Sequence, residues 1–210
     1  MPTKSGPITV LLVRSGRTEW DDQDRLQGRT DLPMSLSGEE ALAALLPHVS
    51  AAAPAAGVST VYSSPDESST QTAQALADRF ATKARTVPDL HAVDLGVWDG
   101  LLDAQLMERF PTSYRQWKDD PAAVNPPEGE TFADAEARLL DAATKLLDKA
   151  NGRGVALVLR PLAFGILACW LGGKRSRELW SIVDDGPAFL VLSVGRDLLR
   201  SFAESLRARS

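Results

Sequence analysis

Four short apolar runs, separated by longer stretches with helical periodicity, limit the possible folds of this chain more than any other feature. The runs cover residues 8–13, 59–62, 155–159 and 188–194. Continuous apolar runs of this length predict strands buried on both faces, as in a parallel sheet. Because they alternate with helical stretches, we predict an α/β fold: a three-layer α/β/α sandwich with a mostly parallel central sheet.

Capping residues and a proline mark the starts of three predicted helices. Ser37 with Glu40, and Thr131 with Asp134, fit the capping-box pattern that opens a helix. Pro161 suits the first turn of an apolar helix, which we expect to be buried on most sides. The predicted helices cover residues 38–49, 132–150 and 161–170, and the predicted loops cover residues 51–57 and 121–129.

The last part of the chain fits two different structures. Residues 189–202 contain two apolar segments with a glycine-containing turn at residues 195–197, which predicts a β-hairpin. Leu199, Phe202 and Leu206 also fit the apolar stripe of a helix. We favour the hairpin from sequence and keep the helix as the alternative.

Length and charge narrow the class of protein. The chain has 210 residues, which suits a single domain over residues 1–210. It carries 23 basic and 28 acidic residues, and it has no basic run of the kind that binds nucleic acid. Residues 1–7 are short and polar, and the longest apolar run, 161–171, is too short to cross a bilayer. We therefore expect neither nucleic acid nor a membrane as a partner.

Cysteine and histidine are scarce in this sequence. The single cysteine, Cys169, rules out a disulfide within the chain and fits a reducing compartment. One cysteine and two scattered histidines do not give the spacing of a zinc site. We therefore expect a cytoplasmic protein without a metal or another cofactor.

A series of short motifs extends over most of the chain. They are LLVRSGRTEW at 11–20, RLQGRTDLP at 25–33, LSG at 36–38, VYSSP at 61–65, QTA at 71–73, VDLGVWDG at 93–100, PPEGET at 126–131 and VALVL at 155–159. In this order the motifs resemble those of the histidine phosphatase superfamily, which has the phosphoglycerate mutase-like fold. The resemblance implies that fold and a phosphate pocket at the carboxyl ends of the strands.

The resemblance also shows where this chain departs from the family. An Arg-His-Gly triplet follows the first strand in the family, and its histidine attacks phosphorus to become a phosphohistidine. The corresponding triplet here is Arg14-Ser15-Gly16. By the same resemblance, Ser15 stands where the nucleophilic histidine would be, and Arg14 keeps the identity of the family's first arginine.

Four further pocket positions differ in the same comparison. The family's second arginine corresponds to Ser68, and its carboxylic acid corresponds to Ala92. Its second histidine corresponds to Arg160, and an asparagine that is frequent in the family corresponds to Asp21. The resemblance therefore implies a pocket that lacks both histidines, the second arginine and the acid.

The chemistry of these residues supports the same conclusion without the family. The Ser15 hydroxyl needs a base to take its proton before it can act as a nucleophile. Arg160 cannot serve as that base, because a guanidinium stays protonated. His91 directly precedes Ala92 in a segment expected to be extended, so the two side chains should face opposite sides. We therefore expect a pseudoenzyme with a binding, regulatory or structural role.

Arg14 and Arg160 suggest a remaining anion site. Arginine binds phosphate or carboxylate with two parallel hydrogen bonds, and ligands of α/β sheets bind at the carboxyl ends of the strands. A small anionic ligand of this kind is one expectation. The other is an internal ion-pair cluster, in which acidic residues neutralise the two arginines. The acidic candidates are Asp21, Asp66 and Glu67.

Two alternatives remain open for function and partners. One is a phosphatase or other hydrolase with weak or altered chemistry, which would use Ser15, or acids such as Asp66 and Glu67, beside the Arg14 and Arg160 anion site. Against it, Ser15 also suits a plain turn residue that bonds nearby backbone. The other alternative concerns association, because a retained fold without catalysis fits a protein partner or a homodimer.

An inserted cap is expected over residues 101–130. This segment resembles the helical and loop insertion that covers the pocket in small members of the same family. Its large side chains are Met107, Phe110, Tyr114 and Trp117. Aromatic residues in such a segment more often pack than contact a ligand, so we expect them to form a local core.

Overall fold

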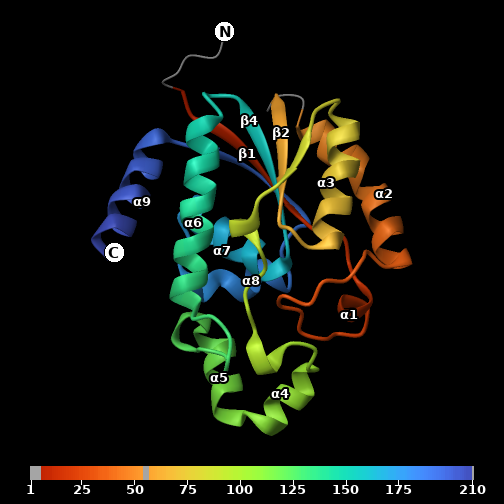
Figure 1. The fold of residues 1–210 in the computed structure, drawn as a ribbon, viewed down its shortest axis with the longest axis vertical. Helices are drawn as coiled ribbons and strands as arrows, with labels where there is room; N and C mark the ends of the chain where they lie inside the picture. Colours follow the sequence, from red (N-terminus) through yellow and green to blue (C-terminus); the bar gives the residue numbers. More distant parts are fainter. Residues whose placement is uncertain (1–5, 54–56, 210) are drawn as a thin grey trace.

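The computed structural model describes residues 6–53 and 57–209 and places a five-stranded sheet between two layers of helices (Figure 1). The strand order is β3-β2-β4-β1-β5. β5 runs antiparallel to β1, and the other neighbouring strands are parallel. The strands are β1 Ile8–Arg14, β2 Val58–Ser63, β3 Ala84–Thr86, β4 Gly154–Leu159 and β5 Phe189–Val194. The predicted three-layer sandwich with a mostly parallel sheet is confirmed.

Helices cover both faces of this sheet (Figure 1). The α-helices are α1 Glu19–Asp22, α2 Leu36–Ala52, α3 Glu67–Arg79, α4 Asp103–Arg109, α5 Pro111–Asp119, α6 Phe132–Lys149, α7 Pro161–Leu171, α8 Leu179–Val183 and α9 Arg196–Arg209. Four 3₁₀ turns are η1 Pro88–Leu90, η2 Gly96–Trp98, η3 Pro121–Ala123 and η4 Ser176–Glu178. Among the residues described, no helix has both the length and the apolar character needed to cross a membrane.

The side chains of β1 show why both faces of the sheet need a cover. Val10 and Leu12 belong to the large core cluster that includes residues of α6, α7 and α9. Leu11 and Val13 belong to a second cluster, with residues of α2 and α3. Successive side chains of a strand point to opposite faces, so a continuous apolar run buries both of them. All four side chains are fully buried.

The helix starts agree with the sequence in one case and differ in another. Thr131 caps α6 as predicted, because its hydroxyl accepts a hydrogen bond from the Asp134 backbone nitrogen. The cap of α2 is Ser35 and not Ser37, so the prediction was wrong by two residues. Ser37 instead lies inside the helix and donates to Asp22. Ser35 also donates to Asp22, but only Ser35 accepts from the backbone of the first turn, at the Gly38 nitrogen.

Two elements near the sheet edges were missed or misassigned. β3 has only three residues, too few for an apolar pattern, and it pairs with β2 at the edge. The predicted C-terminal hairpin is wrong, because Arg196–Arg209 forms helix α9 after β5. Leu199 and Phe202 are buried against the core, as the alternative helical stripe requires. Of the predicted loop 51–57, residues 54–56 lie outside the described part of the chain.

The segment over residues 101–130 forms the lower end of the molecule in Figure 1 and consists of α4, α5, η3 and loops. Trp117 of this segment is buried between two other tryptophans. Its ring centroid lies 5.5 Å from that of Trp98 and 5.1 Å from that of Trp180. Trp180 also donates its indole N–H to the Trp117 carbonyl oxygen at 2.7 Å. The aromatic residues of the segment therefore join it to the rest of the core.

Candidate functional site

Two segments that are far apart in sequence meet where β1 and β4 end. These strands are parallel neighbours, and Arg14 at the end of β1 pairs with Leu159 at the end of β4. The Ser15 backbone nitrogen then donates to the Leu159 carbonyl oxygen at 2.8 Å. Ser15 and Arg160, which follow the two strands, are consequently side by side at the carboxyl edge of the sheet, where ligands of open α/β sheets bind.

The Arg160 guanidinium lies inside the protein and binds four side-chain oxygens. Arg160 is 2% exposed. One terminal nitrogen donates to the hydroxyl oxygens of Ser15 at 3.2 Å and Ser68 at 3.5 Å. The other donates to Asp21 at 2.9 Å and to Gln27 at 2.7 Å. Arg160 thus contacts Ser15 and Ser68, two of the positions singled out by the sequence motifs, with Asp21 as the counter-charge.

Thr18 holds the two acceptors on the Asp21 side in place. It caps α1, and its backbone nitrogen donates to the second carboxylate oxygen of Asp21 at 2.7 Å. Its hydroxyl donates to Gln27 at 2.6 Å. Sequence reasoning placed Asp21 here but missed Thr18 and Gln27. Both belong to the quoted motifs, and an uncharged residue carries no signal that it serves a buried arginine.

Ser68 lies in the first turn of α3 and connects Arg160 to Asp66. Its hydroxyl donates to Asp66 Oδ1 at 3.0 Å and accepts from Arg160. Asp66 is the N-cap of α3, because the same oxygen accepts from the Ser69 backbone nitrogen. Glu67 is exposed, and its carboxylate accepts from Gln71 on the same helix. Of the three acidic candidates, Asp21 therefore pairs directly with Arg160, and Asp66 is linked to Arg160 through the Ser68 hydroxyl. Glu67 has no part in this network in the described residues.

Arg14 has its partners in a different part of the structure. Its terminal nitrogens donate to the main-chain carbonyl oxygens of Ile182 and of Val183, the latter at 2.7 Å. The guanidinium also lies 5.1 Å from the centre of the Phe164 ring. Burial lowers the pKa of Arg14 from its usual value. In the described residues, the side-chain hydrogen bonds of Arg14 thus go to α8. Those of Arg160 go to Ser15, Ser68, Asp21 and Gln27.

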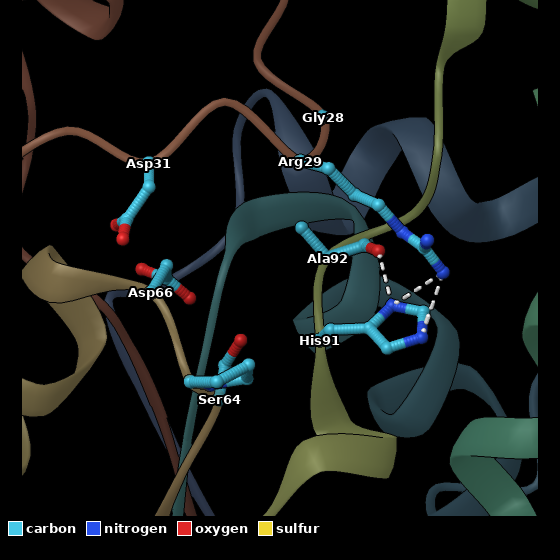
Figure 2. Close-up of a pocket in the computed structure, with 8 residues that line it drawn as sticks. Gly28, Arg29, Asp31, Ser64, Asp66, His91 and Ala92 are labelled. Carbon is cyan, nitrogen blue, oxygen red and sulfur yellow. Dashed lines mark hydrogen bonds between the residues drawn. The ribbon is translucent and has the colours of Figure 1, made fainter.

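A cavity of about 250 Å³ lies beside this cluster (Figure 2). Its lining residues are Gly28, Arg29, Asp31, Ser64, Pro65, Asp66, His91 and Ala92. The Ala92 methyl group points toward the side of Asp31 and Asp66, and the His91 ring extends the other way, against Arg29 (Figure 2). The opposite orientation expected for these two neighbours is what Figure 2 shows.

His91 has the bonding pattern of a neutral imidazole. Its Nδ1 lies 2.8 Å from the Ala92 carbonyl oxygen, and its Nε2 lies 2.8 Å from an Arg29 terminal nitrogen. A ring with one N–H donor and one acceptor satisfies both contacts. Burial, followed by the charges of Arg138 and Arg29, lowers the pKa of His91. The ring nitrogens of His91 are therefore engaged with Arg29 and with the Ala92 carbonyl oxygen, and in the described residues they form no hydrogen bond with Ser15.

The geometry determines what chemistry Ser15 has available. Its hydroxyl accepts from Arg160, and in the described residues no histidine or carboxylate forms a hydrogen bond with it. A serine nucleophile needs such a base. Among the same residues, no group of three or more His, Cys, Asp or Glu side chains is arranged to hold a metal ion. Ser15 is therefore an acceptor for a buried cation that is paired with Asp21.

The sequence matches the histidine phosphatase superfamily (branch 1) over residues 10–197. It is 24% identical over 185 residues to phosphoserine phosphatase 1 of Hydrogenobacter thermophilus, covering 88% of this chain and 86% of that protein. It is 31% identical over 152 residues to the bifunctional protein Rv2228c of Mycobacterium tuberculosis, covering 72% of this chain but only 41% of that longer protein.

The fold is also found among solved structures. The structure described as mycobacterial hydrolase 1 superposes with a TM-score of 0.77, covering 89% of each chain at 24% sequence identity. Similarity at that level of identity shows that the two chains share a fold. The phosphoglycerate mutase-like architecture expected from the motifs is therefore confirmed.

Proposed function

The chain belongs to the histidine phosphatase superfamily, branch 1, and we propose that it is a non-catalytic member that has kept the fold for a binding, regulatory or structural role. The observation that carries this proposal is the position of Arg160. Its buried guanidinium lies between Ser15, Ser68 and Asp21, where the family resemblance places the reacting phosphate. A fixed internal cation takes the place of a site for the substrate.

The missing nucleophile and the missing base would both slow the same phosphoryl-transfer reaction. Ser15 has no base among the described residues, and Arg160 cannot accept a proton. Ala92 carries no acid. Removing catalytic groups that work as a unit costs about 10⁶-fold in rate, so little turnover is expected to remain. Asp21 supplies the negative charge that a phosphate would otherwise supply to Arg160.

A hydrolase with altered chemistry is the second candidate, and the structure gives it less support. It would use Ser15 as the nucleophile, with Arg14 and Arg160 as an anion clamp. The Ser15 hydroxyl accepts from Arg160, and Arg14 donates to the carbonyl oxygens of Ile182 and Val183. The terminal nitrogens of both arginines already donate to groups within the chain.

The proposal predicts no phosphomonoesterase activity. Purified protein should hydrolyse neither p-nitrophenyl phosphate nor 3-phosphoglycerate faster than a Ser15→Ala variant of matched purity. It should also form no acid-labile phosphohistidine. Turnover well above that of the Ser15→Ala variant would refute the proposal.

Restoring the family residues tests the reason for inactivity. Ser15→His alone should stay inactive, because the new imidazole would lie against the Arg160 guanidinium, now 3.2 Å from the Ser15 hydroxyl. The fair comparison is the quadruple variant Ser15→His, Ser68→Arg, Ala92→Glu and Arg160→His, in which the internal cation is also removed. Phosphatase activity in the folded quadruple variant alone would support our account, whereas robust turnover of Ser15→His by itself would contradict it.

A further inference from the structure

The cavity in Figure 2 contains buried oxygen atoms that lack a hydrogen-bond donor. Ser64 is 0% exposed, and in the described part of the chain its hydroxyl has no partner. The second carboxylate oxygen of Asp66, Oδ2, is likewise buried and without a partner there. In Figure 2 the Ser64 hydroxyl points upward into the space below Ala92 and beside Asp66. A buried polar atom without a partner costs free energy, so each atom calls for a donor from outside the chain.

Helix capping accounts for only part of the acidity of this cavity. Asp66 uses Oδ1 for the Ser69 nitrogen and the Ser68 hydroxyl. Asp31 uses Oδ1 for the Glu67 nitrogen at 2.7 Å. Each carboxylate therefore has one oxygen bound at the start of α3 and a second oxygen that capping does not use. The two acidic side chains lie on the same side of the cavity (Figure 2).

The basic groups around the cavity do not neutralise this acidic wall. The Arg29 side chain is 49% exposed and turns toward His91 and Asp94, the latter at 3.5 Å. His91 contacts Arg29 and the Ala92 carbonyl oxygen, and burial lowers its pKa. Arg160 reaches Ser68 but is paired with Asp21. Two carboxylates and a hydroxyl therefore face the space beside the Ala92 methyl group, and they repel an anion and attract a donor with positive charge.

We infer that this cavity binds the primary ammonium group of a small organic amine. An ammonium has three N–H donors, which match Asp66 Oδ2, the Ser64 hydroxyl oxygen and the Asp31 carboxylate. The residues described offer no set of three or more metal-binding side chains, which disfavours a divalent cation. A volume of about 250 Å³ admits an amine with a few carbon atoms. The inference specifies a ligand for the binding role proposed above and rests on that role.

Titration of the full chain with ethylammonium chloride at constant ionic strength, followed by NMR, tests this inference. Saturable shifts of the Gly28 and Ala92 amide signals are expected. Tetramethylammonium chloride, which has no N–H donor, and inorganic phosphate should not produce them.

Three variants locate the binding energy. Asp66→Asn keeps the capping oxygen of α3 but replaces Oδ2 with a donor, and it should weaken amine binding about tenfold or more. Ser64→Ala should weaken binding and leave the melting temperature unchanged or raised, because the lost hydroxyl has no partner in the described chain. Glu67→Gln is the matched control: it removes an exposed charge next to Asp66 and should bind ethylammonium as the wild type does.

Three results would overturn the inference: no saturable shifts with ethylammonium, undiminished binding by folded Asp66→Asn, or saturation of the same signals by phosphate. The test is separate from that of the lost catalysis. An inactive protein that binds no amine would refute only the inference about the amine ligand. An active phosphatase that binds amine would refute only the non-catalytic proposal.

Discussion

A guanidinium differs from an imidazole in ways that decide what position 160 can do. It remains charged at ordinary pH and offers five N–H donors, so when buried it requires a counter-charge and several acceptors. Asp21 provides the charge, and Gln27, Ser15 and Ser68 provide oxygens. Arg160 is thereby part of the internal structure, because removing it would leave Asp21 without its ion-pair partner.

Removing either member of this ion pair should destabilise the fold. Arg160→Met and Asp21→Asn should each lower the free energy of unfolding by about 3 kcal/mol, because each leaves the other group partly buried and unpaired. The double variant should lose less than the sum, with a coupling of about 1–3 kcal/mol. Urea unfolding of the four proteins measures this cycle.

An exposed ion pair offers the control for that cycle. Lys145 and Asp141 pair on the surface of α6 at 2.5 Å. Lys145→Met should change stability little, since solvent screens exposed pairs. Equal losses of unfolding free energy for Lys145→Met and Arg160→Met would contradict this prediction, as would strictly additive losses for Arg160→Met and Asp21→Asn. Either result would show that burial does not strengthen the Arg160–Asp21 pair.

At the scale of elements, Asp22 joins α1 to the start of α2. Its carboxylate accepts from the hydroxyls of Ser35 at 2.7 Å and Ser37 at 2.6 Å, and it pairs with Arg17 at 2.8 Å. The hydrogen bonds from Ser35, Ser37 and Arg17 lower the pKa of Asp22 to about 2. This network fixes the segment that also carries Thr18 and Asp21. It therefore helps to hold Asp21 in position beside Arg160.

The lowered pKa of Asp22 predicts a pH-dependent contribution to stability. A carboxylate whose pKa is lower in the folded chain stabilises it above the unfolded pKa, near 4, and loses that effect as the pH falls toward 2. Because solvent reaches this side chain, Asp22→Asn should cost about 1 kcal/mol or less at pH 7. The difference between wild type and Asp22→Asn in urea unfolding should be constant from neutral pH to about pH 5 and shrink below pH 4. A difference that grows on acidification would contradict this assignment.

At the scale of the whole molecule, three tryptophans connect the segment over residues 101–130 to the layers around the sheet. Trp98 lies in η2, Trp117 in α5 and Trp180 in α8, and their rings meet edge to face in sequence. Edge-to-face aromatic contacts add to the free energy gained from burial. The segment over residues 101–130 is therefore expected to unfold together with the rest of the chain.

Trp117→Ala should lower the free energy of unfolding by about 3–5 kcal/mol, because it empties a buried site between two aromatic rings. Trp117→Phe should cost less, since it keeps part of the contact. Met107→Ala in α4 is the control, because Met107 is 52% exposed. Hydrogen exchange should show lost protection throughout the chain in Trp117→Ala. Loss confined to α4 and α5 would instead show that these two helices unfold on their own.

Much of the fold follows from the sequence because its signals are local. The apolar runs predicted β1, β2, β4 and β5, and Thr131 predicted the start of α6. These patterns depend on neighbouring residues, and a strand that is buried on both faces has a continuous apolar run in the sequence. β3 has no such apolar run, because this three-residue edge strand is defined by its pairing with β2.

The sequence by itself determined which groups stand at the ends of two strands: Ser15 follows β1 and Arg160 follows β4, and neither supplies a base. The tertiary structure makes these strands parallel neighbours. Only the tertiary structure decided how those groups are used. Arg14 turns to the carbonyl oxygens of α8, and Arg160 finds Asp21 at a separation of 139 residues. The direction in which a buried arginine side chain points depends on the acceptors around it, and these come from distant parts of the sequence. The local pattern of residues does not reveal which acceptors those are.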